Sequence, residues 1–394
     1  MATPAALLDE PGRAAGIRLE HPVQAGALVA RFGSPLLVID CAVVRRQYRA
    51  LAAALPGVDL HYALKPLPEA AVVRALAEEG SWFDLATSGE IELVRAAGIP
   101  AGRCIHTHPI KRDADIRAAL DFGVSTFVAD NVDEFIKLQP YRQQLRMLLR
   151  LSFRSPQATV DLSRKFGCDP AAAPALAEQA AAAGLTIAGF SFHVGSQVAN
   201  PDMYQRAIST CDELLRAGRA RGLGPFDVLD IGGGFPIDYL RAAPEIGAFC
   251  RPIRAALAEL PVDVRVIAEP GRFLCGPAGL GLATVIGRAR RDGRWWYYLD
   301  DGLYGSFSGQ LYDGSRYPLE PLLPHGGMPE PCVVAGPTCD SIDVVAEDIP
   351  LPELQVGDLV LGRQMGAYTS ATATDFNFLP RARVLAVNVD ADAS

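Results

Sequence analysis

The sequence contains few lysines and no stretch that would track a nucleic acid backbone or cross a membrane. Only four of the 37 basic residues are lysines, no Lys/Arg-rich run is present, and the formal charge is −8 at pH 7. This balance disfavours a nucleic acid partner. No apolar stretch approaches the length of about 18 residues that crosses a bilayer, and Leu7 and Leu8 are followed directly by Asp9 and Glu10 instead of forming a signal sequence. We therefore expect a cytoplasmic protein without nucleic acid or membrane partners.

The cysteines lack the spacing of a metal or redox motif. No C-x-x-C pair occurs, and no histidine lies at metal-ligand spacing from a cysteine. Such a scattered distribution favours free thiols in a reducing compartment, and no metal site is predicted. The eight residues are Cys41, Cys104, Cys168, Cys211, Cys250, Cys275, Cys332 and Cys339.

The chain of 394 residues, 49% hydrophobic and 21% charged, is long enough for two packed cores. Within residues 36–274, short apolar runs alternate with segments of helical period. Eight such runs favour a closed α/β barrel of the (β/α)8 TIM type, with an open doubly wound sheet as the alternative. The runs are Leu60–Leu64, Trp82–Ala86, Arg103–Thr107, Thr126–Ala129, Met147–Leu151, Ile187–His193, Asp227–Ile231 and Val264–Ala268. Helical patterns between them are Glu69–Glu79, Gly89–Ala97, Asp113–Phe122, Pro170–Ala183 and Met203–Arg221.

After Leu274 the pattern changes to short strand-like runs separated by Gly/Pro turns, which predicts a second, mostly β domain. We assign residues 36–274 to the barrel, and residues 1–35 and 275–394 to the β domain. The first 35 residues, with Gly16–Leu19 and Ala27–Ala30, could add a strand or a helix to it. The predicted strands are Trp295–Leu299, Pro331–Ala335, Asp358–Leu361 and Ala382–Val389.

Polar residues follow the predicted barrel strands at their carboxyl ends. In a barrel these ends meet at one mouth, where the loops carry the chemistry. A lysine, an aspartate, an arginine, a histidine, a glycine run, a glutamate and a second arginine would therefore share one opening. These residues are Lys65, Asp84, Arg150, His193, Gly232–Gly234, Glu269 and Arg272.

Lys65 is the lysine best placed for covalent chemistry. It follows an apolar strand and precedes Pro66, where partial desolvation would lower the pKa of its amine and make it nucleophilic. On position alone, a lysine that extends from a strand end into solvent is the competing interpretation. Lys111, Lys137 and Lys165 lie in less suitable surroundings.

The glycines at 232–234 would let backbone amides surround a phosphate, and Arg272 could add a charged contact. Neither the G-x-G-x-x-G spacing nor a P-loop lysine is present, so an ordinary tight turn is the alternative. Glu269 beside a pyridine nitrogen would keep that nitrogen protonated, which makes the ring an electron acceptor. Without such a cofactor, Glu269 would be a salt-bridged strand-end acid, and His193 would be a structural histidine.

Six ordered motifs resemble those of the alanine-racemase-fold (fold type III) pyridoxal-phosphate decarboxylases, specifically the ornithine and diaminopimelate decarboxylase group. The resemblance extends over essentially the whole chain and implies pyridoxal 5'-phosphate as the cofactor. It also implies a head-to-tail homodimer with active sites shared between subunits. The motifs are Tyr62–Lys65, Ser191–Ser196, Asp230–Phe235, Glu269–Arg272, Gly336–Asp340 and Gly366–Tyr368.

The resemblance also implies roles for single residues. Lys65 would bind pyridoxal phosphate as a Schiff base, Glu269 would pair with the pyridine nitrogen, and His193 would stack on the ring. Asp84 and Arg150 would support Lys65 and the ring, and Cys339 of the other subunit would return a proton to the substrate carbon after carbon dioxide leaves. The phosphate would be held by Ser196, Gly232, Gly233, Gly234, Arg272 and Tyr368.

Substrate choice depends on the group that binds the far end of the substrate. Cys339-Asp340 and Tyr312-Asp313 resemble the diamine-forming branch, and two carboxylates suit a distal ammonium. Tyr304 and Phe376 complete the predicted substrate-binding residues. Ornithine is the first expectation and lysine the second, because one methylene changes binding by only about 1–3 kcal/mol. There are three alternatives: decarboxylation of diaminopimelate, decarboxylation of a modified amino acid in secondary metabolism, and an inactive paralogue that binds pyridoxal phosphate. A racemase of this fold is disfavoured by Glu269.

Overall fold

The computed structural model describes residues 22–153, 164–323 and 326–390. The predictions made for Leu7, Leu8 and Gly16–Leu19 lie outside the described residues. The chain divides into two compact units, each described here by itself. One unit comprises residues 47–237 and 243–273, and the other comprises residues 1–46, 238–242 and 274–394.

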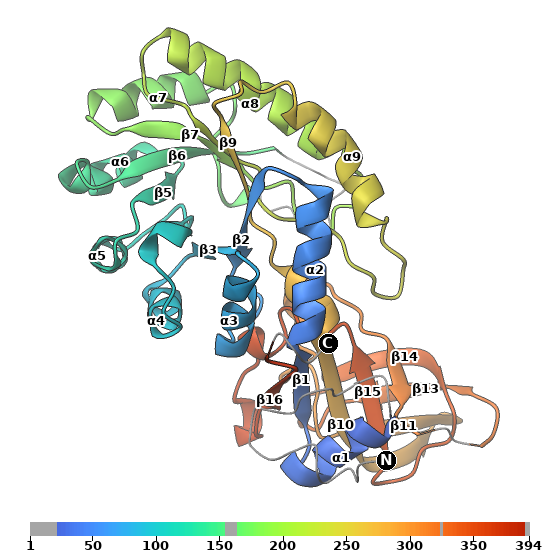
Figure 1. The fold of residues 1–394 in the computed structure, drawn as a ribbon. Coiled ribbons are helices and arrows are strands. Elements are labelled where there is room, and N and C mark those ends of the chain that lie inside the picture. The colour runs from blue at the N-terminus through green and yellow to red at the C-terminus, as the bar shows by residue number, and fades with distance from the viewer. Residues whose placement is uncertain (1–21, 154–163, 324–325, 391–394) are drawn as a thin grey trace. The chain divides into compact units, whose positions relative to one another are not determined.

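The first unit is a closed barrel of eight parallel strands, which confirms the predicted fold class (Figure 1). The barrel closes where β2 pairs with β9, with Leu60 opposite Ala268. The strands coincide with the eight predicted runs to within a few residues. They are β2 (Val58–Ala63), β3 (Trp82–Leu85), β4 (Cys104–His106), β5 (Thr126–Ala129), β6 (Arg146–Leu151), β7 (Ile187–Phe192), β8 (Val228–Asp230) and β9 (Arg265–Ala268).

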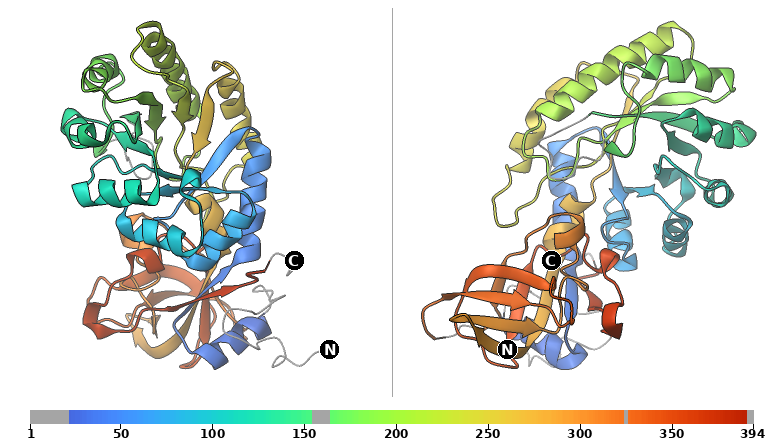
Figure 2. Two further views of the ribbon diagram at one scale, coloured as in Figure 1. Left: turned by 60° about the vertical axis from the view of Figure 1, so that its left-hand side comes forward. Right: turned by 180° about the vertical axis from the view of Figure 1, so that it is seen from behind.

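A helix follows each barrel strand, and the two views of Figure 2 show the long helices on the outside of the strands. The longest helix buries Tyr204, Ala207, Ile208, Cys211 and Leu215, which share one face at helical spacing. The helices are α3 (Ala70–Glu78), α4 (Ser88–Ala96), α5 (Asp113–Phe122), α6 (Val132–Leu138), α7 (Ala173–Ala182), α8 (Asp202–Ala220), α9 (Ile246–Leu257) and α10 (Arg272–Cys275).

The barrel interior is layered, with an apolar layer below a polar one. One buried cluster takes a residue from each of six strands: Ile105, Val128, Leu148, Ala188, Val228 and Ile267. Side chains two positions apart on a strand point to the same side. Two positions beyond five of these residues, toward the carboxyl ends, the chain carries Thr107, Asp130, Arg150, Asp230 and Glu269. The apolar layer therefore fills the barrel, and the charged layer lies at its mouth.

The second unit is built on a mixed β sheet with the strand order β12-β15-β10-β11-β13-β14. Strand β1 pairs antiparallel with β10 and parallel with β16. A core of apolar side chains that includes Leu28, Val38 and Leu282 packs against helix α1. The elements are α1 (Pro22–Phe32), β1 (Leu36–Asp40), β10 (Gly279–Arg291), β11 (Arg294–Leu299), α11 (Gly309–Tyr312), β12 (Leu319–Pro321), β13 (Glu330–Ala335), β14 (Val344–Leu351), β15 (Leu359–Arg363) and β16 (Arg383–Val387).

The start of the chain differs from the predicted domain arrangement. The sequence places the barrel from residue 36, whereas β1 at Leu36–Asp40 belongs to the sheet of the second unit. Every residue of β1 is buried, because β10 lies on one side of it and β16 on the other. Helix α2 (Cys41–Ala54) follows, and the division between the units falls within it, after Arg46.

Candidate functional site

Lys65 lies directly after β2, in a turn that the backbone holds firmly. The Leu64 amide donates to the Asp84 carbonyl at 3.3 Å, and the Tyr62 hydroxyl donates to the Leu67 carbonyl at 2.8 Å. The Lys65 side chain is exposed. Partial desolvation of its amine, which the apolar strand led us to expect, stays a prediction. The structure does supply a fixed strand-end position for the amine, next to charged groups of the barrel mouth.

Three buried carboxyl groups lie at the same mouth. Burial raises the pKa of Asp84 well above its usual value, and the neighbouring Glu269 raises it further. The pKa of Glu269 is also raised well above its usual value, by burial first and then by Asp230. Burial raises the pKa of Asp230 to about 7. The positive charges of Lys65 and Arg150 oppose the shift at Glu269. A cationic group placed between these acids would be strongly stabilised.

Sequence reasoning missed Asp230, although a signal for it exists. It lies two positions after the buried Val228, on the same side of strand β8. Its carboxylate Oδ1 accepts the Gly232 amide at 2.9 Å. Asp230 therefore shapes the glycine turn and also contributes to the electrostatics at Glu269.

His193 is buried and its ring is held by the backbone. The Gly195 amide donates to His193 Nδ1 at 3.1 Å, so this nitrogen is an acceptor. Burial lowers the pKa of His193 well below its usual value, and the charges of Lys65 and Arg150 lower it further. The imidazole is therefore neutral and oriented, as a ring that stacks on a flat ligand would need to be.

The glycine run forms a cradle in which added side chains would collide with backbone. Gly232 and Gly234 have φ angles of 66° and 114°. A Cβ at Gly232 would lie 2.3 Å from the Phe192 carbonyl, and one at Gly233 would lie 2.5 Å from the Glu269 carbonyl. Only glycine fits so close an approach of three strand ends. Close packing therefore requires glycine in this turn, which distinguishes it from the ordinary βα turn that was the alternative interpretation of the sequence.

The cradle is fastened to its neighbours through carbonyl groups. The Glu269 amide donates to the Gly232 carbonyl at 2.8 Å, and the Tyr204 hydroxyl donates to the Gly233 carbonyl at 2.8 Å. Arg272 is buried, and its guanidinium donates to Ser196 Oγ at 3.2 Å. The structure thus brings together two of the predicted phosphate ligands from different strand ends.

The barrel mouth fits pyridoxal phosphate. The pKa values of Glu269 and Asp230 are raised first by burial, and a protonated pyridine nitrogen beside these acids would oppose that shift. Close packing restricts these positions to glycine, so no side chain covers the turn, as a phosphate site in the glycine run requires. A lysine at the same mouth, with the half-buried Arg150 at the end of β6, completes the set of groups that such a cofactor needs.

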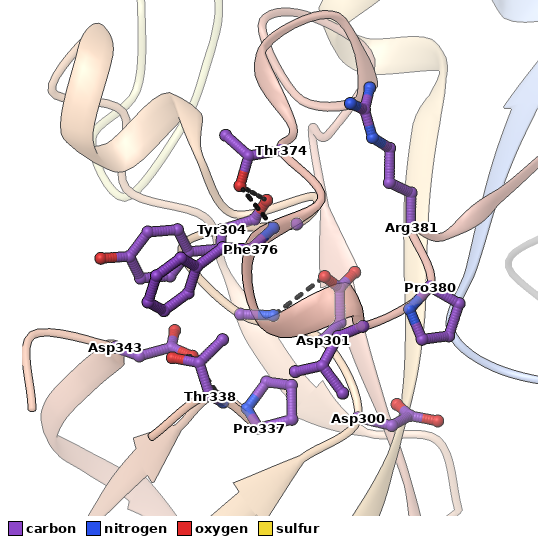
Figure 3. A pocket seen from close by; sticks show the side chains of 13 residues that line it. Asp300, Asp301, Tyr304, Pro337, Thr338, Asp343, Thr374, Phe376, Pro380 and Arg381 are labelled. Atoms are coloured by element: carbon purple, nitrogen blue, oxygen red, sulfur yellow. Dashed lines mark hydrogen bonds between the residues drawn. The ribbon is translucent and has the colours of Figure 1, made fainter. Parts of the chain in front are cut away.

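The second unit gathers another set of predicted residues on its own loops. Tyr304 and Phe376 stack with ring centroids 4.3 Å apart, as Figure 3 shows. The Tyr304 hydroxyl donates to Asp340 Oδ2 at 2.5 Å, and this bond is the main reason that the pKa of Asp340 is lowered. Asp340 is therefore a carboxylate at neutral pH. Cys339, next to it, has a free and exposed thiol.

The other predicted residues of this unit are Tyr312, Asp313 and Tyr368. Tyr312 is exposed at the end of α11. The hydrogen bond to Asp340 is the main reason that the pKa of Tyr304 is raised to about 12. Asp313 accepts a hydrogen bond from Ser315 Oγ at 3.1 Å in its own loop. The Tyr368 carbonyl accepts from Thr372 Oγ1 at 3.0 Å. Sequence reasoning missed Asn377, whose side chain contacts Cys339. Phosphate binding by Tyr368 stays a prediction.

Within the described ranges, no group of three or more His, Cys, Asp or Glu side chains is arranged to hold a metal ion. In the same part of the chain, no helix combines the length and the apolar character that crossing a membrane requires.

Comparisons of the sequence with a family model and with known proteins both find decarboxylases. Residues 41–276 match the family model of the pyridoxal-dependent decarboxylases, pyridoxal binding domain. The lysine/ornithine decarboxylase of Selenomonas ruminantium is 37% identical over 351 residues, 89% of this chain and 88% of that protein. A chloroplastic ornithine decarboxylase of Nicotiana glauca is 35% identical, over 87% of this chain and 81% of that protein.

A solved structure agrees with these sequence relatives. The lysine/ornithine decarboxylase of Vibrio vulnificus, complexed with putrescine, superimposes with a TM-score of 0.90 at 53% identity. The match covers 95% of this chain and 100% of that one. The Vibrio vulnificus enzyme complexed with cadaverine also superimposes with a TM-score of 0.90.

Proposed function

Because this chain belongs to the pyridoxal-dependent decarboxylases, we propose that it decarboxylates a basic L-amino acid, L-ornithine to putrescine in the first place and L-lysine to cadaverine in the second. Pyridoxal 5'-phosphate is its cofactor, and the enzyme is a carboxy-lyase. The observation that carries the choice of a basic substrate is the Asp340 carboxylate, which Tyr304 orients beside the Cys339 thiol.

The barrel mouth binds and orients the cofactor. Lys65 would bind its aldehyde through the amine, and the Gly232–Gly234 cradle would bind its phosphate together with Ser196 and Arg272. Tyr368 would complete the phosphate site. Asp84 and Arg150 would support Lys65 and the cofactor ring.

Glu269 and His193 control the ring. When bound, pyridoxal phosphate supplies a pyridinium ring that accepts the electron pair released with carbon dioxide. Glu269 keeps the ring nitrogen protonated, because a buried carboxylate is stabilised by the adjacent cation. His193 presents a neutral ring whose orientation is set by the Gly195 amide, so it packs against the cofactor without adding charge.

The loop residues act on the substrate. Asp340 would bind the distal ammonium of ornithine or lysine, since its lowered pKa keeps it charged. Tyr304 and Phe376 would line the path of the aliphatic chain, with Tyr312 and Asp313 at its far end. The Cys339 thiol would donate its proton to the substrate carbon that has lost carbon dioxide.

The relatives from Selenomonas ruminantium and Vibrio vulnificus are lysine/ornithine decarboxylases, which supports a site that accepts substrates of both chain lengths. One methylene in such a pocket changes the free energy of binding by only about 1–3 kcal/mol. Diaminopimelate fits less well, because its distal carboxylate would face Asp340.

The test is carbon dioxide release from ornithine, lysine, arginine and diaminopimelate in parallel assays with added pyridoxal phosphate. We expect kcat/KM to be highest for ornithine, with lysine next. A preference for diaminopimelate would contradict the proposed role of Asp340.

The quaternary structure belongs to the same proposal. We propose a homodimer in which Cys339 and Asp340 of each subunit serve the barrel mouth of its partner. The exposure of the Cys339 thiol and of large apolar side chains on the same unit, Tyr312 and Ile342, supports this. Mixing inactive Lys65→Ala with the impaired Cys339→Ala should raise activity well above that of either variant alone, because mixed dimers contain one intact site. Activity that does not rise after subunit exchange would refute the shared site.

We also propose a cytoplasmic location. The proposed mechanism needs a reduced Cys339, which a reducing compartment maintains. Fractionation of cells that express the tagged chain should recover it with cytoplasmic markers, and recovery in an oxidising compartment would refute the proposal.

A further inference from the structure

We propose that Asn377 is a positioning residue that accepts a hydrogen bond from the Cys339 thiol and holds its S–H group in a fixed orientation. The inference rests on the proposed role of Cys339 as the proton donor. Asn377 lies in the same unit as Cys339, on the loop that also carries Phe376.

The contact geometry assigns the direction of the hydrogen bond. Asn377 Oδ1 lies 3.3 Å from the Cys339 backbone nitrogen and 3.3 Å from its Sγ. A backbone N–H can only donate, so the side-chain atom that faces it must be the amide oxygen and not the amide nitrogen. That oxygen can only accept, so the sulfur must be the donor and must carry its hydrogen. The contact therefore directs the Cys339 S–H group to Asn377 Oδ1.

The backbone around Asn377 is fixed in a conformation that suits asparagine. Its φ angle is 56°, in the left-handed region that asparagine tolerates better than most residues. Phe376 stacks on Tyr304, and Asp375 pairs with Arg381 through two hydrogen bonds of 2.7 and 2.9 Å. Thr374, Phe376 and Arg381 line one pocket together with Tyr304, as Figure 3 shows. The amide oxygen is thus presented by an anchored loop.

The ionisable groups close to Cys339 are engaged elsewhere. On its own loop, Asp340 accepts from Tyr304, and Asp343 accepts from Thr338 Oγ1 at 2.7 Å. On the Asn377 loop, Asp375 is paired with Arg381. These carboxylates, the Tyr304 hydroxyl and Arg381 are ionisable groups of the two loops and their hydrogen-bond partners. The neutral amide provides an acceptor that does not change charge across the working pH range.

A fixed S–H group matters because the proton must reach one carbon of the substrate. If the proton is instead added to the cofactor carbon, one water then releases the substrate as an aminoaldehyde and leaves the cofactor as its amine. A thiol that rotates freely or loses its proton would permit this outcome more often. Asn377 would therefore determine the fidelity of proton return.

Two substitutions separate the hydrogen bond from backbone strain. Asn377→Gly removes the acceptor and relieves the positive φ, so the loop is not strained by the change. Asn377→Asp keeps an acceptor oxygen and adds a negative charge, which would favour the thiol further. Phe378→Gly is the matched control, since Phe378 is the next residue and has a φ of 55°.

The primary measurement is the rate at which iodoacetamide alkylates Cys339 in the holoenzyme without substrate, followed by mass spectrometry from pH 6 to 10 (about the range in which thiols ionise). For Asn377→Gly we expect alkylation about fivefold faster near neutral pH, with the midpoint of the profile moved down. For Asn377→Asp we expect slower alkylation with the midpoint moved up. Profiles of both variants that coincide with those of wild type and Phe378→Gly would overturn the proposal.

A second measurement separates this proposal from the function of Cys339 itself. The ratio of aldehyde to amine product should rise in Cys339→Ala, and to a smaller extent in Asn377→Gly. If Cys339→Ala leaves this ratio and the turnover rate unchanged, the proposed role of Cys339 fails, while the alkylation profiles still decide whether Asn377 holds the thiol.

Discussion

The barrel mouth and the loop cluster of the second unit are built by different means. At the barrel mouth, the functional side chains follow strand ends and are mostly buried, and backbone hydrogen bonds fix the turns that carry them. In the loop cluster, Tyr304, Cys339 and Asp340 lie on connections between strands, and contacts between side chains, such as those of Tyr304 with Asp340 and Phe376, contribute to holding them. Rigid backbone suits a permanently held cofactor, whereas loops suit the adjustment of substrate preference.

The largest effect is expected at the barrel mouth from Lys65→Ala, which should abolish decarboxylation. It should also abolish the absorbance band near the visible edge that the bound cofactor gives in wild type. Borohydride should fix the cofactor to the peptide that contains residue 65 in wild type only. Lys165→Ala is the control and should keep the band. A wild-type holoenzyme from which borohydride recovers the cofactor on another peptide would contradict the assignment of Lys65.

The largest effect in the loop cluster is expected from Cys339→Ala. We expect kcat to fall by about 10²-fold, which is the lower range for loss of a general acid, while the cofactor absorbance is retained. Cys168→Ala, at the only other cysteine that is not buried in the structure, should change kcat little. If Cys339→Ala lost the cofactor, the loop cluster would also contribute to cofactor binding, and the proposed division of roles between the two regions would be wrong.

The rigidity of the barrel mouth can be tested with Gly233→Ala. The new Cβ would lie 2.5 Å from the Glu269 carbonyl, so backbone must shift. We expect a loss of about 1–3 kcal/mol in the free energy of unfolding together with weaker cofactor binding. Denaturant titration measures the first, and the control Gly102→Ala adds a Cβ that meets no atom within 4 Å. Equal stability of the two variants would show that the cradle is more pliable than its contacts indicate.

The buried acids should make the cofactor-free protein less stable as the pH rises. The pKa of Asp230 is raised to about 7 in the folded chain, so the folded state binds this proton more tightly than the unfolded state does. Its contribution is present at pH values below its unfolded pKa near 4 and is lost as the pH rises to about 7. We expect Asp230→Asn to flatten this part of the stability profile by about 4 kcal/mol, the free energy that corresponds to a pKa near 4 in the unfolded chain and about 7 in the folded one. A profile identical to that of wild type would contradict the raised pKa.

The smallest effect is expected from Asp340→Asn, which changes charge on a loop. We expect KM for ornithine to rise about tenfold, equivalent to about 1.4 kcal/mol, with a smaller change in kcat. Asp348→Asn is the matched control, because Asp348 is an exposed carboxylate that pairs with Arg294. Unchanged KM in Asp340→Asn would place recognition of the distal ammonium elsewhere.

Sequence analysis identified the barrel because each of its strands is a short, buried apolar run set apart by helical periods. The analysis was less successful for strands whose pairing partners lie far away in the sequence. Strand β10 was missed, since its glycines and arginines dilute the apolar alternation, and β1 was given to the barrel although its partners β10 and β16 come much later in the chain. Local patterns contain no information on such distant partners.

The same distinction applies to the site. Lys65, Glu269 and the glycine run could be picked out because they follow recognisable strands. Asp230 was overlooked because it ends a strand of three residues, and Asn377 because its contact with Cys339 joins two loops of irregular backbone. The assignment of single roles came from motif resemblance and stays a prediction, since spacing alone does not identify a ligand.

The pairing of β1 has a consequence for how the protein is made. The Asn388 side chain donates to Asp40 at 3.0 Å in a buried contact between residues 348 positions apart. During synthesis, β1 leaves the ribosome early and must wait for β16, the last strand of the chain, before its second edge is covered. Over that interval one edge of an apolar strand stays unpaired, which makes this stage of folding the one most exposed to aggregation.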